Sequence, residues 1–346
     1  MSEFAIAHEA VRVGRPAVPA RTRAEREDAE EALLAACATR SRGGGERATA
    51  EAPDPHRTCF ERDLDRIQHS RAFRRLAGKC QVFIAPDDDH LRTRLTHAIE
   101  VCQVAVSVSR AIGLNVALTA AAATGHDCGH GPAGHASEGA LSPFLTGGFH
   151  HAVFGADVVL APLNLCRETL DAIRNHSWNR PPPATPEGEV VAWADRVAYV
   201  CHDFEDAVAA GIVTAAALPT AVTDVLGPDR RTQLHRLITA MVDTVSTTGV
   251  VGMRDPEASA LDAFRAFNFD RIYLRPASVA QAERVTCLLR QLTEWFIEHP
   301  EELDGHAWGD PVAAAVRHVS GMTDRFALAL AVERLGWDAA DLPRGV

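Results

Sequence analysis

The residues best suited to chemistry lie in one short run, positions 126–138, which reads His-Asp-Cys-Gly-His-Gly-Pro-Ala-Gly-His-Ala-Ser-Glu. Three imidazoles and two carboxylates lie within these thirteen positions. Such groups bind catalytic divalent metal ions and transfer protons near neutral pH. Three interspersed glycines let the backbone turn, so that the side chains can converge. The density of costly polar groups favours a metal-dependent catalytic loop over the alternative, a solvated polar turn.

Four residues are the expected ligands of one metal ion: His97, His126, Asp127 and Asp195. They lie on or at the end of three expected helices, and helices of a bundle can aim such side chains at a common point. Ligation by imidazoles and two carboxylates suits Mn²⁺, Mg²⁺ or Fe²⁺, and zinc is less favoured without thiolates. Each residue alone has a structural alternative: a hydrogen-bonded core histidine for His97, and a partner of an arginine for Asp195.

A second His-Asp pair, His202-Asp203, shows that the doublet by itself is weak evidence, so spacing must decide between the two. Asp195, Tyr199 and Asp203 are spaced by four residues and therefore share one side of a helix. If Asp195 faces the metal, Tyr199 and Asp203 line the adjoining pocket, whereas His202 falls beside this stripe. Tyr199 could stack on a substrate ring, and filling core space is the equally plausible alternative.

The sequence around these residues predicts the helices that would position them. A helix over 91–111 carries His97 and ends at Gly113, and a second over 115–124 leads into His126. A third begins after the proline-rich break at 181–186 and carries Asp195. Further helical patterns lie near 229–247, 256–266, 277–298 and 310–335. Strand signals are scarce and no repeat recurs, so we expect an all-α fold.

The expected organisation has three parts. Residues 1–55, rich in Arg, Glu, Ala and Gly, are expected to form a flexible N-terminal arm with room for a short helix over 22–37. Residues 56–225 would form the metal-dependent core. Residues 226–346 would add C-terminal helices packed on that core.

Composition bounds the function further. The chain has 346 residues and a net charge of −11, which argues against general nucleic-acid binding, since that needs a basic surface. No apolar run reaches the roughly 18–20 residues that span a membrane. Eight cysteines stand singly, which predicts neither a disulfide framework nor a thiolate zinc site and fits the cytoplasm. Arginine supplies almost every positively charged side chain. The single lysine, Lys79, is either present by chance or lies at a position that needs an ammonium group.

With these residues assembled, the sequence resembles the HD-domain phosphohydrolases, and within them the bacterial deoxyguanosine triphosphate triphosphohydrolase (dNTPase) family. The pattern His, His-Asp, Asp of that group is matched by the four expected metal ligands. Further blocks of similarity, between about 57 and 335, are His69–Leu76, Lys79–Phe83, Arg92–His97, Asp195–Tyr199 with His202-Asp203, and Gly321–Arg325. The resemblance implies an HD-domain helical bundle with additional C-terminal helices.

The resemblance also implies an activity: hydrolysis of a deoxynucleoside triphosphate (dNTP), with attack at the α-phosphorus, to the deoxynucleoside and inorganic tripolyphosphate. Lys79, Arg94 and Arg196 would hold the polyphosphate. His135 would act as general acid or in the attack, oriented by Glu138 three residues on, and His130 and His151 would complete the group of proton-transferring residues. By family analogy, Gln81 and Asp203 would contact the deoxyribose. A homo-oligomer is expected as the assembly.

Departures from the family pattern leave alternatives open. The metal loop has Cys128 and Ala133 where the family has Leu and Phe, and residues 152–157 read Ala-Val-Phe-Gly-Ala-Asp where the family has Asn, Gln and Arg among its residues. The lost cation could alter nucleotide recognition. The alternatives are a phosphohydrolase acting on a modified nucleotide, a nucleoside monophosphate or a cyclic nucleotide, and a catalytically inert nucleotide sensor.

Overall fold

The computed structural model describes residues 5, 7, 8, 17–86, 88–303, 310–343 and 345. The expected all-α fold is confirmed for these residues, which contain two isolated β-bridges but no strand. The helices are α1 (Arg23–Leu33), α2 (Cys59–His69), α3 (Arg71–Arg75), α4 (Arg94–Ile112), α5 (Val116–Gly125), α6 (His135–Leu141), α7 (His151–Phe154), α8 (Arg167–Asn175), α9 (Pro186–Ala209), α10 (Thr220–Leu226), α11 (Arg230–Thr248), α12 (Glu257–Asn268), α13 (Pro276–Glu298), α14 (Pro311–Ser320) and α15 (Asp324–Leu335). None of the helices in this described part is long and apolar enough to cross a membrane.

Local sequence signals fix the ends of the three helices that carry the expected metal ligands. The side chain of Thr93 caps the start of α4, and Gly113, with φ of 73°, ends it in the left-handed conformation. Asn115 accepts hydrogen bonds from the first free amides of α5. Thr185 caps α9, whose first residue is Pro186, a position where the missing N–H is harmless.

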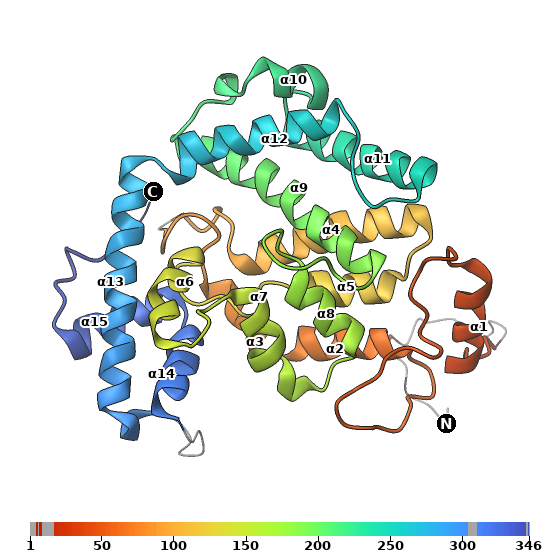
Figure 1. The fold of residues 1–346 in the computed structure, drawn as a ribbon, viewed down its shortest axis with the longest axis horizontal. Coiled ribbons are helices and arrows are strands. Elements are labelled where there is room, and N and C mark those ends of the chain that lie inside the picture. The colour runs from red at the N-terminus through yellow and green to blue at the C-terminus, as the bar shows by residue number, and fades with distance from the viewer. Residues whose placement is uncertain are drawn as a thin grey trace.

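Two large apolar clusters and one small one, formed by Cys59, Phe60, Leu118 and Cys166, hold the helices together. The first joins α2, α4, α5 and α8 to α9–α12, and the second joins α6 to α13–α15. Figure 1 shows α10–α12 along one side of the central helices and α13–α15 at one end of the molecule. The first cluster continues to Ile272 and so extends past residue 225, where the sequence suggested a boundary. The division into three parts stays a prediction.

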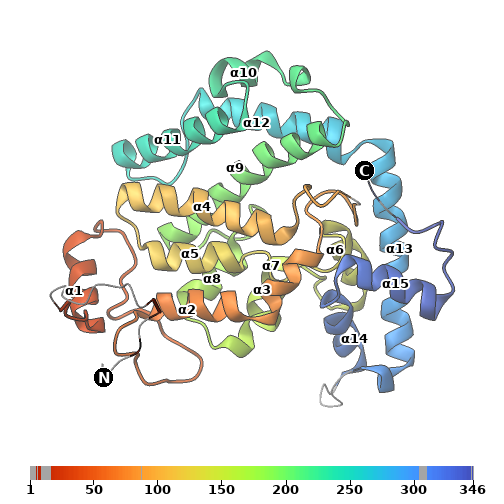
Figure 2. The same ribbon diagram turned by 180° about the vertical axis from the view of Figure 1, so that it is seen from behind.

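Residues 17–55, the part of the expected flexible arm that the structure describes without a gap, are anchored to the body. Helix α1 lies at the opposite end of the molecule from α13–α15 in both views (Figure 2). The main anchor is Arg47, which donates a 2.6 Å hydrogen bond to the fully buried Asp63 of α2. Asp63 also accepts from the Cys166 amide at 2.8 Å and from the Thr169 hydroxyl at 2.7 Å. These contacts tie the segment to α2 and α8.

We expect Arg47→Ala to lower the free energy of unfolding by about 3–5 kcal/mol, because it leaves the Asp63 carboxylate buried without its cation. Denaturant-induced unfolding followed by circular dichroism measures the change. The matched control is Arg167→Ala, whose ion pair with Glu46 has side chains that are 78% and 75% exposed. This control should change stability by less than about 0.5 kcal/mol. Equal effects of the two substitutions would contradict the anchoring role of Arg47.

Candidate active site

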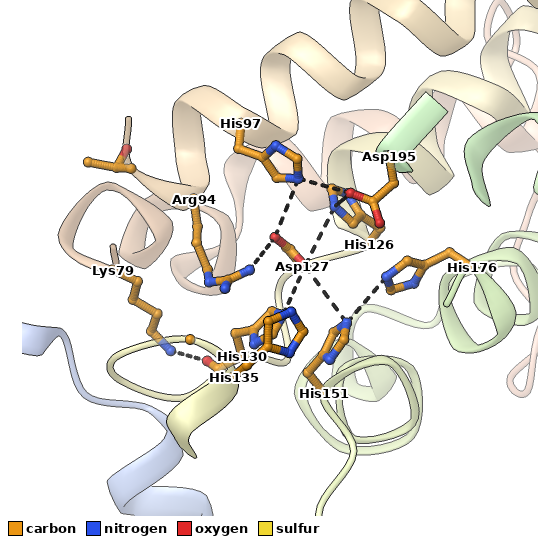
Figure 3. A network of polar contacts seen from close by, with 12 residues as sticks. Lys79, Arg94, His97, His126, Asp127, His130, His135, His151, His176 and Asp195 are labelled. Atoms are coloured by element: carbon orange, nitrogen blue, oxygen red, sulfur yellow. Dashed lines mark hydrogen bonds and ion pairs between the residues drawn. The ribbon is translucent and has the colours of Figure 1, made fainter. Parts of the chain in front are cut away.

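The structure brings the four expected metal ligands together from three helices (Figure 3). His97 projects from α4, His126 and Asp127 directly follow α5, and Asp195 projects from α9. His97 Nε2 lies 3.1 Å from Asp195 Oδ1 and 4.0 Å from Asp127 Oδ2. His126 Nε2 lies 3.5 Å from Asp127 Oδ1 and 3.8 Å from Asp195 Oδ1. The four side chains therefore surround one point.

The donor set fits a divalent cation, as the contacts of His126 show. Its Nδ1 lies 2.7 Å from the Ala123 carbonyl, which can only accept, so Nδ1 donates to it. The buried Nε2 is thereby directed at the carboxylates of Asp127 and Asp195, and it has no hydrogen-bond partner. A cation bound between this nitrogen and the carboxylate oxygens would give all of these buried atoms a partner. Two imidazoles and two carboxylates suit Mn²⁺, Fe²⁺ or Mg²⁺.

Asp127 is the most densely surrounded of these groups. Arg94 donates a 2.7 Å hydrogen bond to its Oδ2, and His130 Nε2 lies 3.2 Å from its Oδ1. Burial alone would raise the pKa of Asp127, but the neighbouring His126, Arg94 and His130 hold that pKa well below its usual value. Asp127 is therefore ionised and ready to bind a cation. Arg94, expected to hold phosphate, is bonded to this carboxylate and also lines the cavity described below.

Close packing shapes the loop that follows Asp127. A Cβ on Gly129 would lie 2.0 Å from the carbonyl oxygen of His151, so only glycine lets the loop approach α7. Gly134, at the start of α6, has φ of 58° and would clash with Arg94 if it had a side chain. The amide of Ala133 donates to Asp324 Oδ1 at 2.8 Å, and the amide of Cys80 donates to Asp324 Oδ2 at 2.8 Å. Asp324 thereby joins the loop to the C-terminal helices.

Lys79 does not lie where the sequence suggested. It is buried, it is not among the residues that line the cavity, and its ammonium donates to the carbonyls of His130 and Ser320. Burial lowers the pKa of Lys79 to about 7. The structure therefore gives Lys79 a positioning role, because it connects the metal loop to the end of α14, and a direct contact with phosphate is not supported.

Glu138 orients His151 more closely than His135. Its Oε1 lies 2.6 Å from His151 Nδ1 and accepts from the His151 amide at 2.9 Å, whereas its Oε2 lies 3.4 Å from His135 Nδ1. Burial opposes ionisation, but hydrogen bonds from both histidines hold the pKa of Glu138 far below its usual value. His130 and His151 stack with ring centroids 3.7 Å apart, and the side chain of His135 is 74% exposed. His135 is thus the histidine of this group with the freest access to a ligand.

A cavity of about 740 Å³ adjoins the metal cluster and contains most of the expected substrate-binding residues. Gln81, Arg94, Arg196, Tyr199 and Asp203 line it. The guanidinium of Arg196 lies over the ring of Trp178, 3.2 Å from its centroid. The Tyr199 hydroxyl accepts a 3.0 Å hydrogen bond from Arg265. The expected stripe of Asp195, Tyr199 and Asp203 along one helix therefore faces a single cavity.

Asp203 and Gln81 each present an acceptor atom without a partner. Asp203 Oδ2 accepts from the Tyr273 hydroxyl at 2.6 Å, while Oδ1 is buried and unbonded. Gln81 Oε1 is likewise buried without a hydrogen bond. Unpaired buried acceptors are costly, so these two atoms indicate a place for a hydroxyl donor.

Several residues of the site were not found from the sequence. His176, at the end of α8, has its Nε2 3.3 Å from His151 Nε2 and lines the cavity. Its only signal was a histidine at a helix end, outside the dense run at 126–138. The cavity is also lined by Arg265, Phe269, Tyr273 and Arg275, which come from α12, the π-helix at Phe269–Tyr273 that follows it, and the start of α13. No motif marked them, because their role depends on the packing of α12 against α9.

The unusual block at 152–157 lies away from the cavity. None of its residues is among those that line the cavity. Ala152, Gly155 and Ala156 are buried, and Asp157 forms an ion pair with Arg174. Gly155 packs against Gly129 of the metal loop. The block therefore supports the loop from behind and does not contact a ligand in the cavity.

Comparison with known proteins agrees with this geometry. The HD domain matches residues 94–200, and the phosphohydrolase-associated domain matches residues 251–333. A deoxyguanosinetriphosphate triphosphohydrolase-like protein of Caldanaerobacter subterraneus subsp. tengcongensis is 37% identical over 314 residues, which cover 87% of this chain and 92% of the relative. The chain belongs to the deoxyguanosinetriphosphate triphosphohydrolase-like family of HD-domain phosphohydrolases.

One further relative and one solved structure are also similar to this chain. A protein of the same description from Ruegeria sp. is 34% identical, with 84% of this chain and 95% of the relative covered. A hypothetical protein of known structure from Aquifex aeolicus has 16% identity and a TM-score of 0.48, over 79% of this chain and 68% of its own. Family membership confirms the expected HD helical bundle with additional C-terminal helices.

We expect Asp203 to make the stability of the protein depend on pH. Burial raises the pKa of Asp203 from 3.8 to about 7, so the folded state holds this proton more tightly than the unfolded chain. The contribution of Asp203 to the free energy of unfolding should therefore fall by about 1.4 kcal/mol per pH unit between about pH 4 and 7, and level off above. Unfolding of wild type and Asp203→Asn across pH 4–8 measures this difference.

Tyr273→Phe provides a control for this prediction. The Tyr273 hydroxyl lowers the pKa of Asp203, so its removal should move the end of the decline to higher pH. Wild-type and Asp203→Asn curves that run parallel over the whole range would rule out a raised pKa at Asp203.

Proposed function

We propose that this protein hydrolyses a dNTP to the deoxynucleoside and inorganic tripolyphosphate, with the help of a divalent cation held by His97, His126, Asp127 and Asp195. One observation carries the proposal: the cation cluster lies at the wall of a cavity that also presents arginines, aromatic rings and unpaired acceptors. A triphosphate, a base and a sugar need these three kinds of contact.

The sugar is expected beside Asp203 and Gln81. Their unpaired oxygens can accept a hydrogen bond from a 3′-hydroxyl, and Tyr199 lies one helical turn from Asp203 toward the metal ligands. Because Tyr199 is held by Arg265, its ring limits the room at C2′. This arrangement supports a preference for deoxyribose over ribose.

Arginines are expected to hold the phosphates. Arg94 and Arg196 both line the cavity, and Arg265 and Arg275 add positive charge to its lining. Guanidinium groups suit phosphate because they donate parallel hydrogen bonds. These arginines can bind the phosphates in the role that was expected of Lys79. A bound divalent cation would polarise a phosphoryl oxygen and neutralise charge that develops during attack at the α-phosphorus.

His135 is expected to transfer the proton to the leaving 5′-oxygen or to act in the attack. It lines the cavity and, unlike His130 and His151, is largely exposed. His130 contacts Asp127, and Glu138 fixes His151, so these residues would position the catalytic group.

The cytoplasmic location of the protein and its assembly as a homo-oligomer stay predictions.

Two features favour an enzyme over an inert sensor: the cation ligands converge, and the divergent block 152–157 does not line the cavity.

The decisive experiment supplies the protein with Mn²⁺ or Mg²⁺ and a panel of dNTPs and NTPs, with chromatographic analysis of products. We expect deoxynucleoside and tripolyphosphate. Two other outcomes would contradict the proposal. One is a different product, either a nucleoside monophosphate with pyrophosphate or orthophosphate. The other is hydrolysis confined to nucleoside monophosphates or cyclic nucleotides.

Asp127→Ala should abolish both cation binding and turnover, since water cannot replace the charge of the lost carboxylate. Metal analysis of the purified variant and the same product assay measure the two effects. Arg167→Ala, on the exposed surface, is the control that should keep both. An Asp127→Ala protein with full metal content and activity would refute the assignment of this ligand.

A 2′,3′-dideoxynucleotide should be a poor substrate of the intact protein, and Asp203→Ala should lower kcat/KM for dNTPs by about 10²-fold or more. With a dideoxynucleotide, the buried Asp203 carboxylate is left without its hydroxyl donor, and in Asp203→Ala the 3′-hydroxyl is left without its acceptor. A buried polar group left unpaired in this way costs several kcal/mol. Steady-state kinetics with matched dideoxy-, deoxy- and ribonucleotides measures the discrimination. Equal turnover of all three would refute the placement of Asp203 beside the sugar.

A further inference from the structure

Two cysteines from distant parts of the sequence meet beneath the N-terminal segment. Cys59 is the first residue of α2, and Cys166 is the N-cap of α8. Both are buried, and they belong to the small apolar cluster that also contains Phe60 and Leu118. Both are free thiols. Neither cysteine lines the cavity, so the pair is separate from the proposed reaction.

The backbone at Gly45 shows how closely the two sulfur atoms approach each other. A Cβ on Gly45 would lie 2.4 Å from Cys59 Sγ and 3.4 Å from Cys166 Sγ, so both sulfur atoms border the same small space. Arg47 donates to the Cys59 carbonyl at 2.9 Å. The Cys166 amide donates to Asp63 at 2.8 Å. The ion pair that anchors the N-terminal segment therefore also holds the two thiols side by side.

The surroundings of Cys59 favour its thiolate. Each cysteine lies at the N-terminal end of a helix, where free amides and the helix dipole stabilise negative charge. Hydrogen bonding with the Cys166 thiol lowers the pKa of Cys59 although burial opposes this, and the same contact together with burial raises the pKa of Cys166. Because the thiolate is the form that reacts with oxidants, Cys59 is the nucleophile of the pair.

The cover over the pair is thin. Gly44 and Gly45 have no side chains and are partly exposed, and Gly43 before them is exposed. Cys59 itself is 8% exposed, whereas Cys166 is fully buried. A small, uncharged oxidant therefore has a short path to the Cys59 sulfur, with the Cys166 thiol next to it.

We propose that Cys59 and Cys166 are a redox-active pair that a peroxide converts to a disulfide. The Cys59 thiolate attacks one oxygen of the peroxide, the O–O bond breaks, and Cys59 becomes a sulfenic acid. The hydroxide that leaves takes up the proton lost by the Cys59 thiol and becomes water. The Cys166 sulfur then attacks Cys59 Sγ, the S–O bond breaks, and the second hydroxide leaves as water with the Cys166 proton. Two electrons pass from the two thiols to the peroxide.

The disulfide would lock the start of α2 to the start of α8. Because the two residues are far apart in the sequence, the bond closes a long loop and restricts the unfolded chain. Disulfides in cytoplasmic proteins are usually transient and act as redox sensors. The oxidised protein is therefore the more stable form, and a thiol reductant returns it to the free thiols.

The test maps the bond in the full chain. The reduced protein is treated with hydrogen peroxide, its remaining thiols are alkylated under denaturing conditions, and its peptides are analysed by mass spectrometry without reduction. We expect a peptide pair linked through Cys59 and Cys166 that disappears after treatment with dithiothreitol. The proposal is overturned if both stay reduced at a peroxide concentration that oxidises the exposed Cys37 and Cys287.

Variants then assign the two roles. Cys166→Ser should leave a sulfenic acid on Cys59 that dimedone traps, because no second thiol can displace it. Serine is a favoured N-cap, so this variant should keep α8. Cys59→Ser should leave Cys166 unlabelled. Labelling of Cys166 in a folded Cys59→Ser protein, or no label on Cys59 in Cys166→Ser, would overturn the proposed order of reaction.

The matched control for these variants is Cys102→Ser. The Cys102 thiol is partly buried and lies 3.9 Å from the Ala120 carbonyl, to which it donates as a serine hydroxyl can. This variant should form the same disulfide as the wild type. Thermal unfolding gives an independent readout: peroxide should raise the midpoint of the wild type and of Cys102→Ser by roughly 5 °C, but not that of Cys166→Ser. An unchanged midpoint in protein that carries the bond would contradict the locking of α2 to α8.

Discussion

The ionised, buried carboxylate of Asp127 is the constraint around which the rest of the site is built. A charge in that position is tolerable only because Arg94 and four histidines lie around it. Those partners come from α4, α7 and the loop between α5 and α6. Each of these elements must reach the same point, and this explains the close approach at Gly129, where no side chain fits. The cost of burying Asp127 is thus offset by groups that also create a place for a cation.

The C-terminal helices contribute to this arrangement although they supply no expected cation ligand. Asp324, at the start of α15, accepts from two amides, one beside Lys79 and one in the metal loop. Lys79 makes the complementary contact from the loop to the end of α14. The loop is therefore held from two sides, by the helix bundle that carries the ligands and by a separate apolar cluster. This double attachment connects the phosphohydrolase-associated region, residues 251–333, to the active site in addition to the residues of that region that line the cavity.

The sequence predicted the parts of the site that depend on local spacing. The helices around His97, His126 and Asp195 could be expected from apolar periodicity and caps, and the structure brings these residues together. His176 and Tyr273 could not be found, because their position depends on how α8 and α12 pack on α9, which is a long-range property. Lys79 was expected to hold phosphate because of the family resemblance, whereas its buried ammonium is bonded to two backbone carbonyls. Composition predicted a flexible N-terminal arm, and within its described part, residues 17–55, Arg47 and Asp63 show how one buried ion pair can anchor a segment of that composition.

The position of Lys79 has a practical consequence for studying motion. It is the only lysine in the chain, and its amine is enclosed between the metal loop and α14. Reagents that attack amines cannot reach it while that enclosure is intact. Any acylation of Lys79 therefore requires the C-terminal helices to separate from the loop, at least transiently. The rate at which Lys79 is labelled therefore reports directly on the separation of the metal loop from the C-terminal helices.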